Sequence, residues 1–578
     1  MQDRQAAMNI YDLRLWKRFR AITVMYWHSE EKWRARGVLA MLVLLMVGST
    51  LIGRQAAVYT GDLTTALSKM DTQAFNRLLL MLFGVYLVLV PTDVYQTYIQ
   101  RKLNINWRTW LTTHFLNKYF ADRAYYHISN DKEIDNPDQR ISDNVAYFTE
   151  TTLGYISVIF GSVLKFCSYA GILWGISPKL MLVLILYATA GTIVTIILGK
   201  PLLGQNFLVQ QLGADFRYGA VHIRDNAESI AFYRGEGREK DRLAQRLREY
   251  IGSQITRIRW ERNLGFFTQL YSIVPSLLST LIIVPDYFSG KIELGALGLA
   301  GMSFSFVLNS LSVFVSSFTG LSSFAATVTR VETFDSALDK NIADHESPGS
   351  NVIRSHEDNR LALDNVTLQT PDYRRTLAGK LSAELSQGKG LLIAGASGAG
   401  KSSLLRAIAG IWNAGSGEIT RPPLREMMFL PQKPYMIQGT LRDQLLYPDL
   451  NMSVTDEDLT AVLARVNLTD LATRFNGFEV VKDWDNMLSL GEQQRLAFAR
   501  LLLTNPRYAM LDEATSALDV ANEAGLYSQI KESGMTYLSV GHRPSLLAFH
   551  DKVLELQGGG AWQIVPADGF RLTAADFK

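Results

Sequence analysis

The chain has 578 residues, too many for one compact domain, and its 48% hydrophobic content reads as the average of two unlike halves. Because 58 Lys and Arg residues face 55 Asp and Glu residues, the net charge of +3 provides no polybasic surface, and we expect no nucleic-acid partner. The single cysteine, Cys167, excludes an intramolecular disulfide framework and a multi-cysteine metal site.

The first half of the chain is predicted to cross a membrane. Residues 1–36 are polar, aromatic and basic, lack a cleavable signal, and are expected to form a cytoplasmic N-terminal segment. Six apolar stretches follow and predict an α-helical six-span domain over residues 37–334. The stretches are residues 37–53, 78–92, 151–177, 180–199, 264–285 and 294–329. Pro178 suits a tight turn between the third and the fourth, because it cannot continue the helix before it.

Long basic loops follow the second and the fourth stretch. By the positive-inside rule, both loops and both termini are predicted to be cytoplasmic. The loops are expected to continue the flanking spans as helices. Within the first loop, Asn136, Pro137 and Gln139 follow the pattern of a capping residue, a first-turn proline and a capping-box glutamine, which predicts a helix start.

Two charged residues are associated with the apolar stretches. Lys165 lies within the third stretch, and Asp93 lies at the end of the second. Charge is costly there, so each residue is a candidate for a substrate pathway. Snorkelling or structural pairing at the membrane edge is the alternative for both residues.

The second half is predicted to be a soluble α/β domain. Residues 335–358 are charged, contain Pro348, Gly349 and Ser350, and are predicted to be a linker to a domain at residues 359–578. There, a buried strand, the pattern GxxxxGKS and a helix succeed one another, as a phosphate-binding loop requires. Backbone N–H groups of the loop converge on phosphates, Lys401 reaches the terminal phosphates, and Ser402 ligates Mg²⁺. The residues expected to bind ATP here are Gly395, Ala396, Ser397, Gly398, Ala399, Gly400, Lys401, Ser402 and Ser403.

Further strand ends carry candidate catalytic residues. Asp512 suits Mg²⁺ ligation, and Glu513 suits the general base that activates water. Gln432 is predicted to reach the metal and the attacking water, and His542 to lie at the γ-phosphate edge. Individually, Gln432 and His542 are also compatible with ordinary strand-end polar residues, and Glu513 with a solvated carboxylate.

Taken in order, these motifs resemble those of ATP-binding cassette transporters, from the first span to His542. Within that superfamily, the sequence resembles the peroxisomal fatty-acyl transporters and their bacterial relatives, which include peptide-antibiotic and cobalamin uptake proteins. The motifs that carry this resemblance include Trp107-Arg108, Tyr125-Tyr126, residues 136–140, residues 228–236, Trp412, residues 431–435 and Tyr447-Pro448. Residues 228–236 are equally compatible with an ordinary amphipathic helix face.

The resemblance implies an exporter-type membrane domain and a homodimer. In such proteins, residues equivalent to Ser489, Gly491 and Glu492 bind the ATP held by the opposite subunit. Leu490 departs from the glycine that is usual in this signature, but Ser489 and Gly491 are retained, so we expect the site to remain competent. Tyr373 is the nearest candidate for stacking on adenine, with an exposed turn residue as the alternative.

Three functions remain open from the sequence. The leading one is ATP-driven transport of an amphipathic small molecule, by resemblance a fatty acid or its acyl-CoA, through a homodimer that works by alternating access. The second is import of a peptide or a cobalamin-like cofactor. The third, an ATP-gated channel or regulator, is disfavoured because gating does not require Glu513 and His542. Without a peroxisomal address at residues 576–578 or an organellar presequence, the lipid bilayer of a bacterial plasma (inner) membrane is the expected location.

Overall fold

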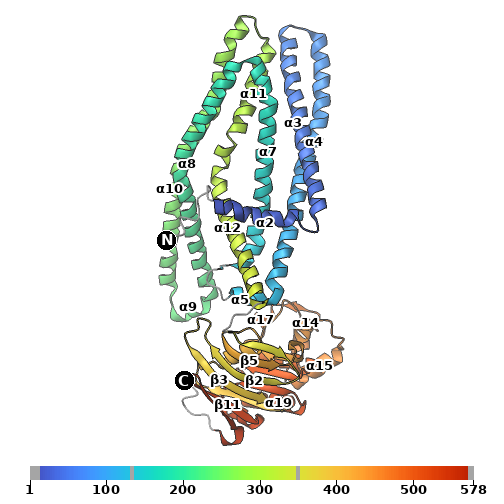
Figure 1. Ribbon diagram of the computed structural model, residues 1–578, viewed down its shortest axis with the longest axis vertical. Helices are drawn as coiled ribbons and strands as arrows, with labels where there is room; N and C mark the ends of the chain where they lie inside the picture. The colour runs from blue at the N-terminus through green and yellow to red at the C-terminus, as the bar shows by residue number, and fades with distance from the viewer. Residues whose placement is uncertain (1–12, 130–133, 135, 347–351, 571–578) are drawn as a thin grey trace. The chain divides into compact units, whose positions relative to one another are not determined.

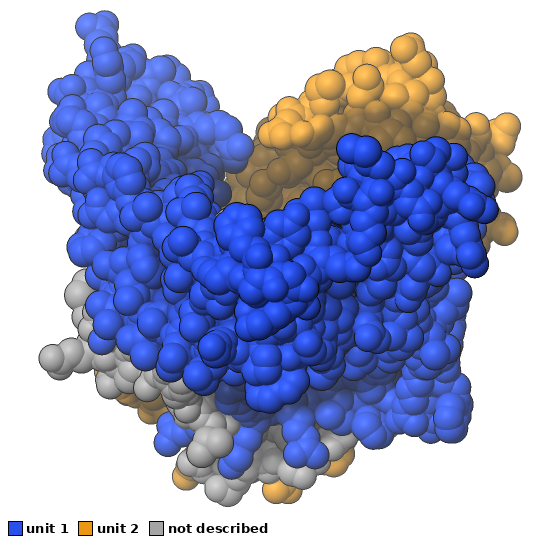
Figure 2. Space-filling view, turned by 90° about the horizontal axis from the view of Figure 1, so that it is seen from above, with its two compact units in different colours: residues 1–342 blue, residues 343–578 orange. Residues whose placement is uncertain are grey.

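The computed structural model describes residues 13–129, 134, 136–346 and 352–570 and divides the chain into two compact units, Met1–Ile342 and Ala343–Lys578 (Figures 1 and 2). The beginning of the N-terminal segment, the predicted linker residues 348–350 and the C-terminal residues 576–578 lie outside the described part. Seen from above, the first unit has two arms on either side of an open notch (Figure 2).

Helices joined by short turns make up the described residues of the first unit. Its longer helices are α2 (Leu13–Trp27), α3 (Lys32–Ser68), α4 (Thr72–Phe120), α7 (Val145–Ile176), α8 (Pro178–Asp225), α10 (Glu236–Phe288), α11 (Leu294–Leu311) and α12 (Val313–Glu346). Its shorter helices are η1 (Ala121–Arg123), α5 (Ala124–Ser129), α6 (Pro137–Gln139), η2 (Arg140–Asn144) and α9 (Ala227–Tyr233). Six of them, α3, α4, α7, α8, α10 and α11, are long and apolar enough to cross a membrane, which confirms the six predicted spans.

The long loops continue the spans as helices, as predicted. Helices α4, α8 and α10 have 49, 48 and 53 residues. At about 1.5 Å per residue each is roughly 70 to 80 Å long, more than twice the hydrocarbon thickness of a bilayer. Ser177 caps α8 by accepting a hydrogen bond from the Leu180 N–H, and Pro178 occupies the first turn, so the predicted tight turn is present.

Three details of the first unit differ from prediction. The sixth span is two helices, α11 and α12, interrupted at Ser312, whose hydroxyl lies 2.9 Å from the Tyr271 hydroxyl. Asn136 precedes α6 in a left-handed conformation (φ 43°) and makes no side-chain cap, and Gln139 instead accepts a hydrogen bond from Arg330 at 3.4 Å. Residues 335–346 continue α12 instead of starting the predicted linker, and Asp335, which is 7% exposed, pairs with Lys118 of α4 at 2.7 Å.

An aromatic core holds α2 against the long helices. The rings of Tyr26 and Trp107 stack with their centroids 5.8 Å apart and an interplanar angle of 12°. Trp107 is fully buried and also meets Phe148 edge to face at 5.7 Å. Trp107, which belongs to one of the motifs behind the family resemblance, is therefore a packing residue in this fold.

The described residues of the second unit form three sheets. A four-stranded sheet has the order β1-β5-β2-β3, a six-stranded sheet the order β12-β11-β4-β10-β9-β6, and β7 pairs with β8. The strands are β1 (Arg354–Glu357), β2 (Leu361–Gln369), β3 (Thr376–Leu385), β4 (Gly390–Gly395), β5 (Gly415–Arg421), β6 (Met427–Leu430), β7 (Gly439–Thr440), β8 (Val481–Lys482), β9 (Tyr508–Asp512), β10 (Thr536–Val540), β11 (Lys552–Gly558) and β12 (Ala561–Pro566). Strands β11, β4, β10, β9 and β6 are parallel, and β12 is an antiparallel edge strand.

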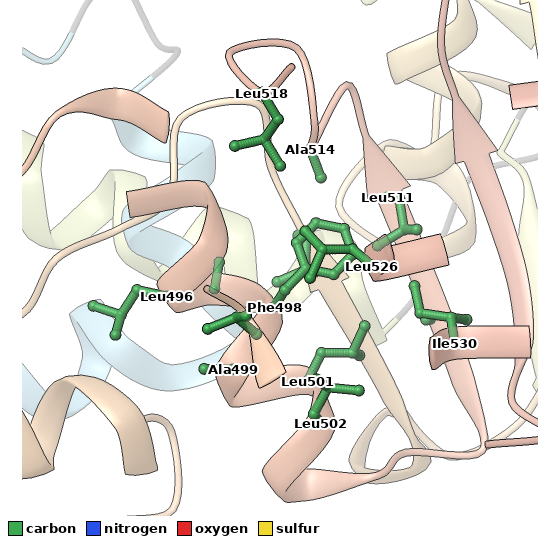
Figure 3. Close-up of a cluster of buried hydrophobic side chains, with 14 of the residues drawn as sticks. Leu496, Phe498, Ala499, Leu501, Leu502, Leu511, Ala514, Leu518, Leu526 and Ile530 are labelled. Atoms are coloured by element: carbon green, nitrogen blue, oxygen red, sulfur yellow. The ribbon is translucent and has the colours of Figure 1, made fainter. Parts of the chain in front are cut away.

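Helices cover the six-stranded sheet. The α-helices of the second unit are α13 (Lys401–Ile408), α14 (Leu441–Leu446), α15 (Asp456–Arg465), α16 (Leu471–Arg474), α17 (Trp484–Met487), α18 (Leu490–Thr504) and α19 (Val520–Glu532). The 3₁₀ turns are η3 (Leu424–Glu426), η4 (Pro544–Phe549) and η5 (Ala567–Gly569). Phe498 and Leu501 of α18, Leu511 of β9, and Leu526 and Ile530 of α19 form one buried cluster (Figure 3). Every residue of β4 and β10 is buried, as central parallel strands require.

A buried histidine, His550, lies between η4 and β11 and contacts β10. The Nδ1–H of His550 donates to the Leu546 carbonyl oxygen at 2.7 Å, so its Nε2 accepts from the Ser539 hydroxyl at 2.9 Å. Both ring nitrogens are thereby used by the neutral imidazole. Burial lowers the pKa of His550 from 6.5 to about 4.

Candidate nucleotide site

Four neighbouring parallel strands end at one edge of the six-stranded sheet. In sheet order these are β4, β10, β9 and β6, and the chain leaves them at Gly395, Val540, Asp512 and Leu430. In open α/β sheets, ligands bind outside the carboxyl ends of parallel strands. The topology therefore brings the phosphate-binding loop, the acidic pair, Gln432 and His542 to the same edge of the sheet.

The phosphate-binding loop, residues 395–402, depends on glycine. Gly395 and Gly400 have φ values of 136° and 104°, which L side chains rarely adopt. A Cβ atom at Gly400 would lie 2.8 Å from the Leu377 Cβ, so β3 also leaves no space there. Lys401 is 6% exposed, and its ammonium group donates to the carbonyl oxygens of Gly395 and Ala396 at 2.7 and 3.0 Å. The loop thus holds the lysine head beside the backbone expected to cradle phosphate.

Ser402 and Asp512 meet across the end of β4 and β9. The Ser402 hydroxyl donates to Asp512 Oδ1 at 2.9 Å. Burial raises the pKa of Asp512, the hydrogen bond from Ser402 opposes that rise, and the neighbouring Glu513 charge adds to it. A hydroxyl and a carboxylate are hard oxygen donors, and Mg²⁺ bound with nucleotide takes its other ligands from phosphates and water. These two side chains therefore fit the predicted Mg²⁺ site.

Glu513 lies at the centre of a hydrogen-bonded group. It follows β9 with φ 49°, a conformation that is costly for a residue other than glycine, and its N–H donates to the Val540 carbonyl at 3.1 Å. This turn directs the carboxylate so that Oε2 accepts from Gln432 Nε2 at 2.9 Å and Oε1 lies 3.2 Å from His542 Nε2. The three candidate catalytic residues, found separately in the sequence, are in contact in the fold.

The sequence analysis missed Gln494 of α18. This side chain is fully buried, and its amide nitrogen donates to the Gln432 carbonyl at 2.8 Å and to the Ser516 hydroxyl at 3.1 Å. Its Oε1 accepts from the Ala517 N–H at 3.0 Å. Gln494 thereby fixes the segment that carries Gln432 relative to the loop after Glu513. A buried polar position in the amphipathic pattern of α18 was the available signal.

The predicted signature residues form the start of α18. The Ser489 hydroxyl and the Glu492 carboxylate form a capping box, and Glu492 also pairs with Arg474 at 2.7 Å. Burial raises the pKa of Glu492, but hydrogen bonds from the Ser489 N–H and from Arg474 outweigh this effect. The pKa of Glu492 is therefore lowered, which keeps the carboxylate charged. A Cβ atom at Gly491 would lie 3.2 Å from the Ala517 carbonyl oxygen. Leu490 is the first residue of α18 and is 42% exposed.

Tyr373 lies in the turn between β2 and β3. It is 47% exposed, has φ 56°, and its N–H donates to the Thr370 carbonyl at 2.8 Å. The turn leads into β3, whose Leu377 packs against Gly400 of the phosphate-binding loop. Both the adenine-stacking role and the exposed-turn alternative are compatible with this position, so the former stays a prediction.

Two family models match most of the chain. Residues 22–288 match the ABC transporter transmembrane region 2, and residues 378–516 match the ABC transporter model. An ABC transporter ATP-binding protein of Synechocystis is 44% identical over 93% of this chain and 82% of its own. ABC transporter D family member 2, chloroplastic, of Arabidopsis thaliana is 38% identical over 94% of this chain and 86% of its own.

One further relative and one solved structure are informative. The lysosomal cobalamin transporter ABCD4 of Homo sapiens is 32% identical over 96% of both chains. The structure of a bacterial Atm1-family ABC exporter with ATP bound superposes with a TM-score of 0.70 at 18% identity, covering 93% of this chain and 96% of the other. That structure supports the exporter-type fold, and the relatives confirm the resemblance to the D subfamily.

Proposed function

The chain belongs to the ATP-binding cassette transporter family, and we propose that it hydrolyses ATP to move an amphipathic solute across a bacterial inner membrane. The observation that supports hydrolysis is the contact of Glu513 with Gln432 and His542 beside the Ser402–Asp512 pair. A protein that used ATP only to gate a channel would not need a general base held in this way.

The proposed chemistry uses each side chain of the site. Lys401 exchanges its two carbonyl partners for terminal phosphate oxygens, a stronger charge-assisted contact. Glu513 accepts the proton of the attacking water, and Gln432 and His542 hold its carboxylate in position. Ser402 and Asp512 would hold Mg²⁺, which would supply positive charge to neutralise the phosphates.

The proposed working unit is a homodimer in the lipid bilayer, with both termini cytoplasmic. Ser489 and Gly491 begin a capped helix, and the helix N-terminus favours anions. In the mechanism implied by the family, this end of α18 completes the ATP site of a second copy. The two copies close on ATP and separate after hydrolysis, which gives alternating access.

Two classes of solute are in competition. The motifs of the cytoplasmic loops favour a fatty acid or acyl-CoA. The similarity to a lysosomal cobalamin transporter along almost the whole chain supports a cobalamin-like cofactor as the second candidate, and a peptide stays open from the family resemblance alone. Neither the loop motifs nor this similarity determines the direction of transport.

ATP hydrolysis by the full-length protein in lipid nanodiscs tests the proposal. We expect turnover that rises and saturates with a long-chain acyl-CoA, and that falls by about 10² to 10⁴ in Glu513→Gln. If acyl-CoA leaves the turnover unchanged, peptides and cobalamin become the favoured substrates. No turnover above that of Glu513→Gln would refute the transporter proposal.

A further inference from the structure

A cavity of about 510 Å³ lies among three spans of the first unit, α3, α4 and α7, with Phe306 of α11 at its margin. These three helices pack side by side (Figure 1). The volume lies within the range of small-molecule sites and suits the headgroup of an amphiphile. Both charged residues singled out in the sequence, Asp93 of α4 and Lys165 of α7, line this one cavity.

These two charges have no partner in the described part of the chain. Neither the Asp93 carboxylate nor the Lys165 ammonium makes an ion pair or a side-chain hydrogen bond there. Charged side chains in a membrane span are costly unless they face a partner or a polar cavity. Structural pairing within the chain, one of the alternatives from the sequence, is therefore not what the fold provides.

The remaining lining contains both polar and aromatic side chains. Gln96 accepts a hydrogen bond from Ser49 at 3.1 Å, and the buried Ser157 hydroxyl oxygen has no hydrogen-bond partner among the described residues. Tyr169, which also lines the cavity, stacks on Phe306 with ring centroids 4.4 Å apart. Polar groups beside an aromatic wall match the two ends of an amphipathic molecule.

We propose that this cavity binds a solute headgroup that carries an anionic group and an N–H donor together, Lys165 taking the anion and Asp93 the donor. This inference rests on the proposed transport function and narrows its substrate class. A free fatty acid satisfies Lys165 and leaves Asp93 unpaired. An acyl-CoA, which has phosphates and amides, satisfies both residues, and so does a peptide.

The test compares lipids with a saturated hydrocarbon chain of the same length and different headgroups. Lysophosphatidylethanolamine carries a phosphate and an ammonium group, lysophosphatidic acid only the phosphate, and hexadecylamine only the amine. Binding of each to the full-length protein in detergent micelles is measured by the quenching of tryptophan fluorescence, independently of ATP. We expect at least tenfold tighter binding of lysophosphatidylethanolamine than of the other two.

Variants assign the selectivity to the two side chains. Asp93→Asn is expected to reduce lysophosphatidylethanolamine binding to the level of lysophosphatidic acid, and Lys165→Gln to the level of hexadecylamine. The exchange Asp93→Lys with Lys165→Asp restores at least part of the preference, because both charges remain in the cavity. Asp62→Asn and Lys179→Gln, exposed positions that do not line the cavity, serve as matched controls and leave it unchanged.

The outcomes separate the two proposals. Normal ATP hydrolysis with equal binding of the three lipids, or with a preference that Asp93→Asn and Lys165→Gln leave intact, overturns the cavity assignment and keeps the transporter. Loss of selectivity in the control variants also overturns it. Absence of hydrolysis in the unmodified protein overturns the transport function, whatever the lipids do.

Discussion

Replacing Glu513 by glutamine removes the proposed general base and leaves the surrounding hydrogen bonds in place. The amide oxygen still accepts from Gln432, and the amide nitrogen donates to His542 Nε2 in its neutral form, so both contacts at 2.9 and 3.2 Å have a counterpart. Glutamine also has the length and backbone demands of glutamate at φ 49°. We therefore expect the free energy of unfolding to change by less than about 1 kcal/mol.

The chemical step responds differently. General-base catalysis contributes about 10² to 10⁴ in rate, so the barrier to hydrolysis is expected to rise by about 3 to 5 kcal/mol. Phosphate release by Glu513→Gln in nanodiscs should fall by that factor, and binding of a fluorescent ATP analogue should stay within threefold of the unmodified protein. Glu532→Gln, an exposed position at the end of α19, is the matched control. Hydrolysis by Glu513→Gln within fivefold of that control, with ATP still bound, would refute the assignment of the base.

Three more predictions concern the second unit. Lys401→Met should weaken ATP binding by roughly 10- to 100-fold in a direct titration, because a charge-assisted hydrogen bond contributes about 1.5 to 3 kcal/mol; unchanged affinity would contradict the phosphate role. The lowered pKa of His550 means that the unfolded state binds the proton first, so stability present above pH 6.5 is lost as the pH falls toward 4, by about 2 kcal/mol at pH 5. His550→Gln should flatten the dependence of the melting temperature on pH between 7.5 and 5, and an equally steep slope would assign that loss to other groups. Leu490→Gly should raise the maximal ATPase rate at least twofold, because glycine opens the exposed start of α18 to a second copy, and should lower the unfolding free energy by about 0.5 to 1 kcal/mol, because glycine is unfavourable in a helix. An unchanged rate would show that the leucine does not obstruct the second copy.

The parts of the site that follow one strand each could be predicted from sequence. The residues after β4 and β9 carry strong local patterns, since a phosphate-binding loop needs glycines and a lysine within eight positions, and Asp512 and Glu513 end an apolar strand. Gln494 could not be found in this way. Its three hydrogen bonds join α18 to two loops distant in sequence, and only the sheet order β4-β10-β9-β6 brings those loops together.

The starts of helices also show that a local sequence pattern does not always predict the local structure. Pro178 lies in the first turn of α8, after the predicted tight turn, and Ser177 caps the helix, because capping is decided within one turn. Asn136 and Gln139 have an equally good local pattern, yet Gln139 bonds to Arg330 and Asn136 is left-handed. A contact with α12, 191 positions away in the chain, replaces the predicted capping box.

The membrane unit provides the clearest case of information that a single sequence does not contain. Periodicity and hydropathy identify Asp93 and Lys165 separately, each as a charge that is costly to place in a span. Considered alone, each is compatible with snorkelling to the membrane edge. Their side chains come from different spans, 72 positions apart, and whether they share one space depends on how α4 and α7 are rotated about their axes. The apolar residues that surround each charge offer no local pattern that fixes this rotation, because the surrounding lipid and the neighbouring helices are equally apolar. Once the packing places both charges on one cavity, the costs of the two residues are no longer independent, since a single solute with complementary groups offsets both.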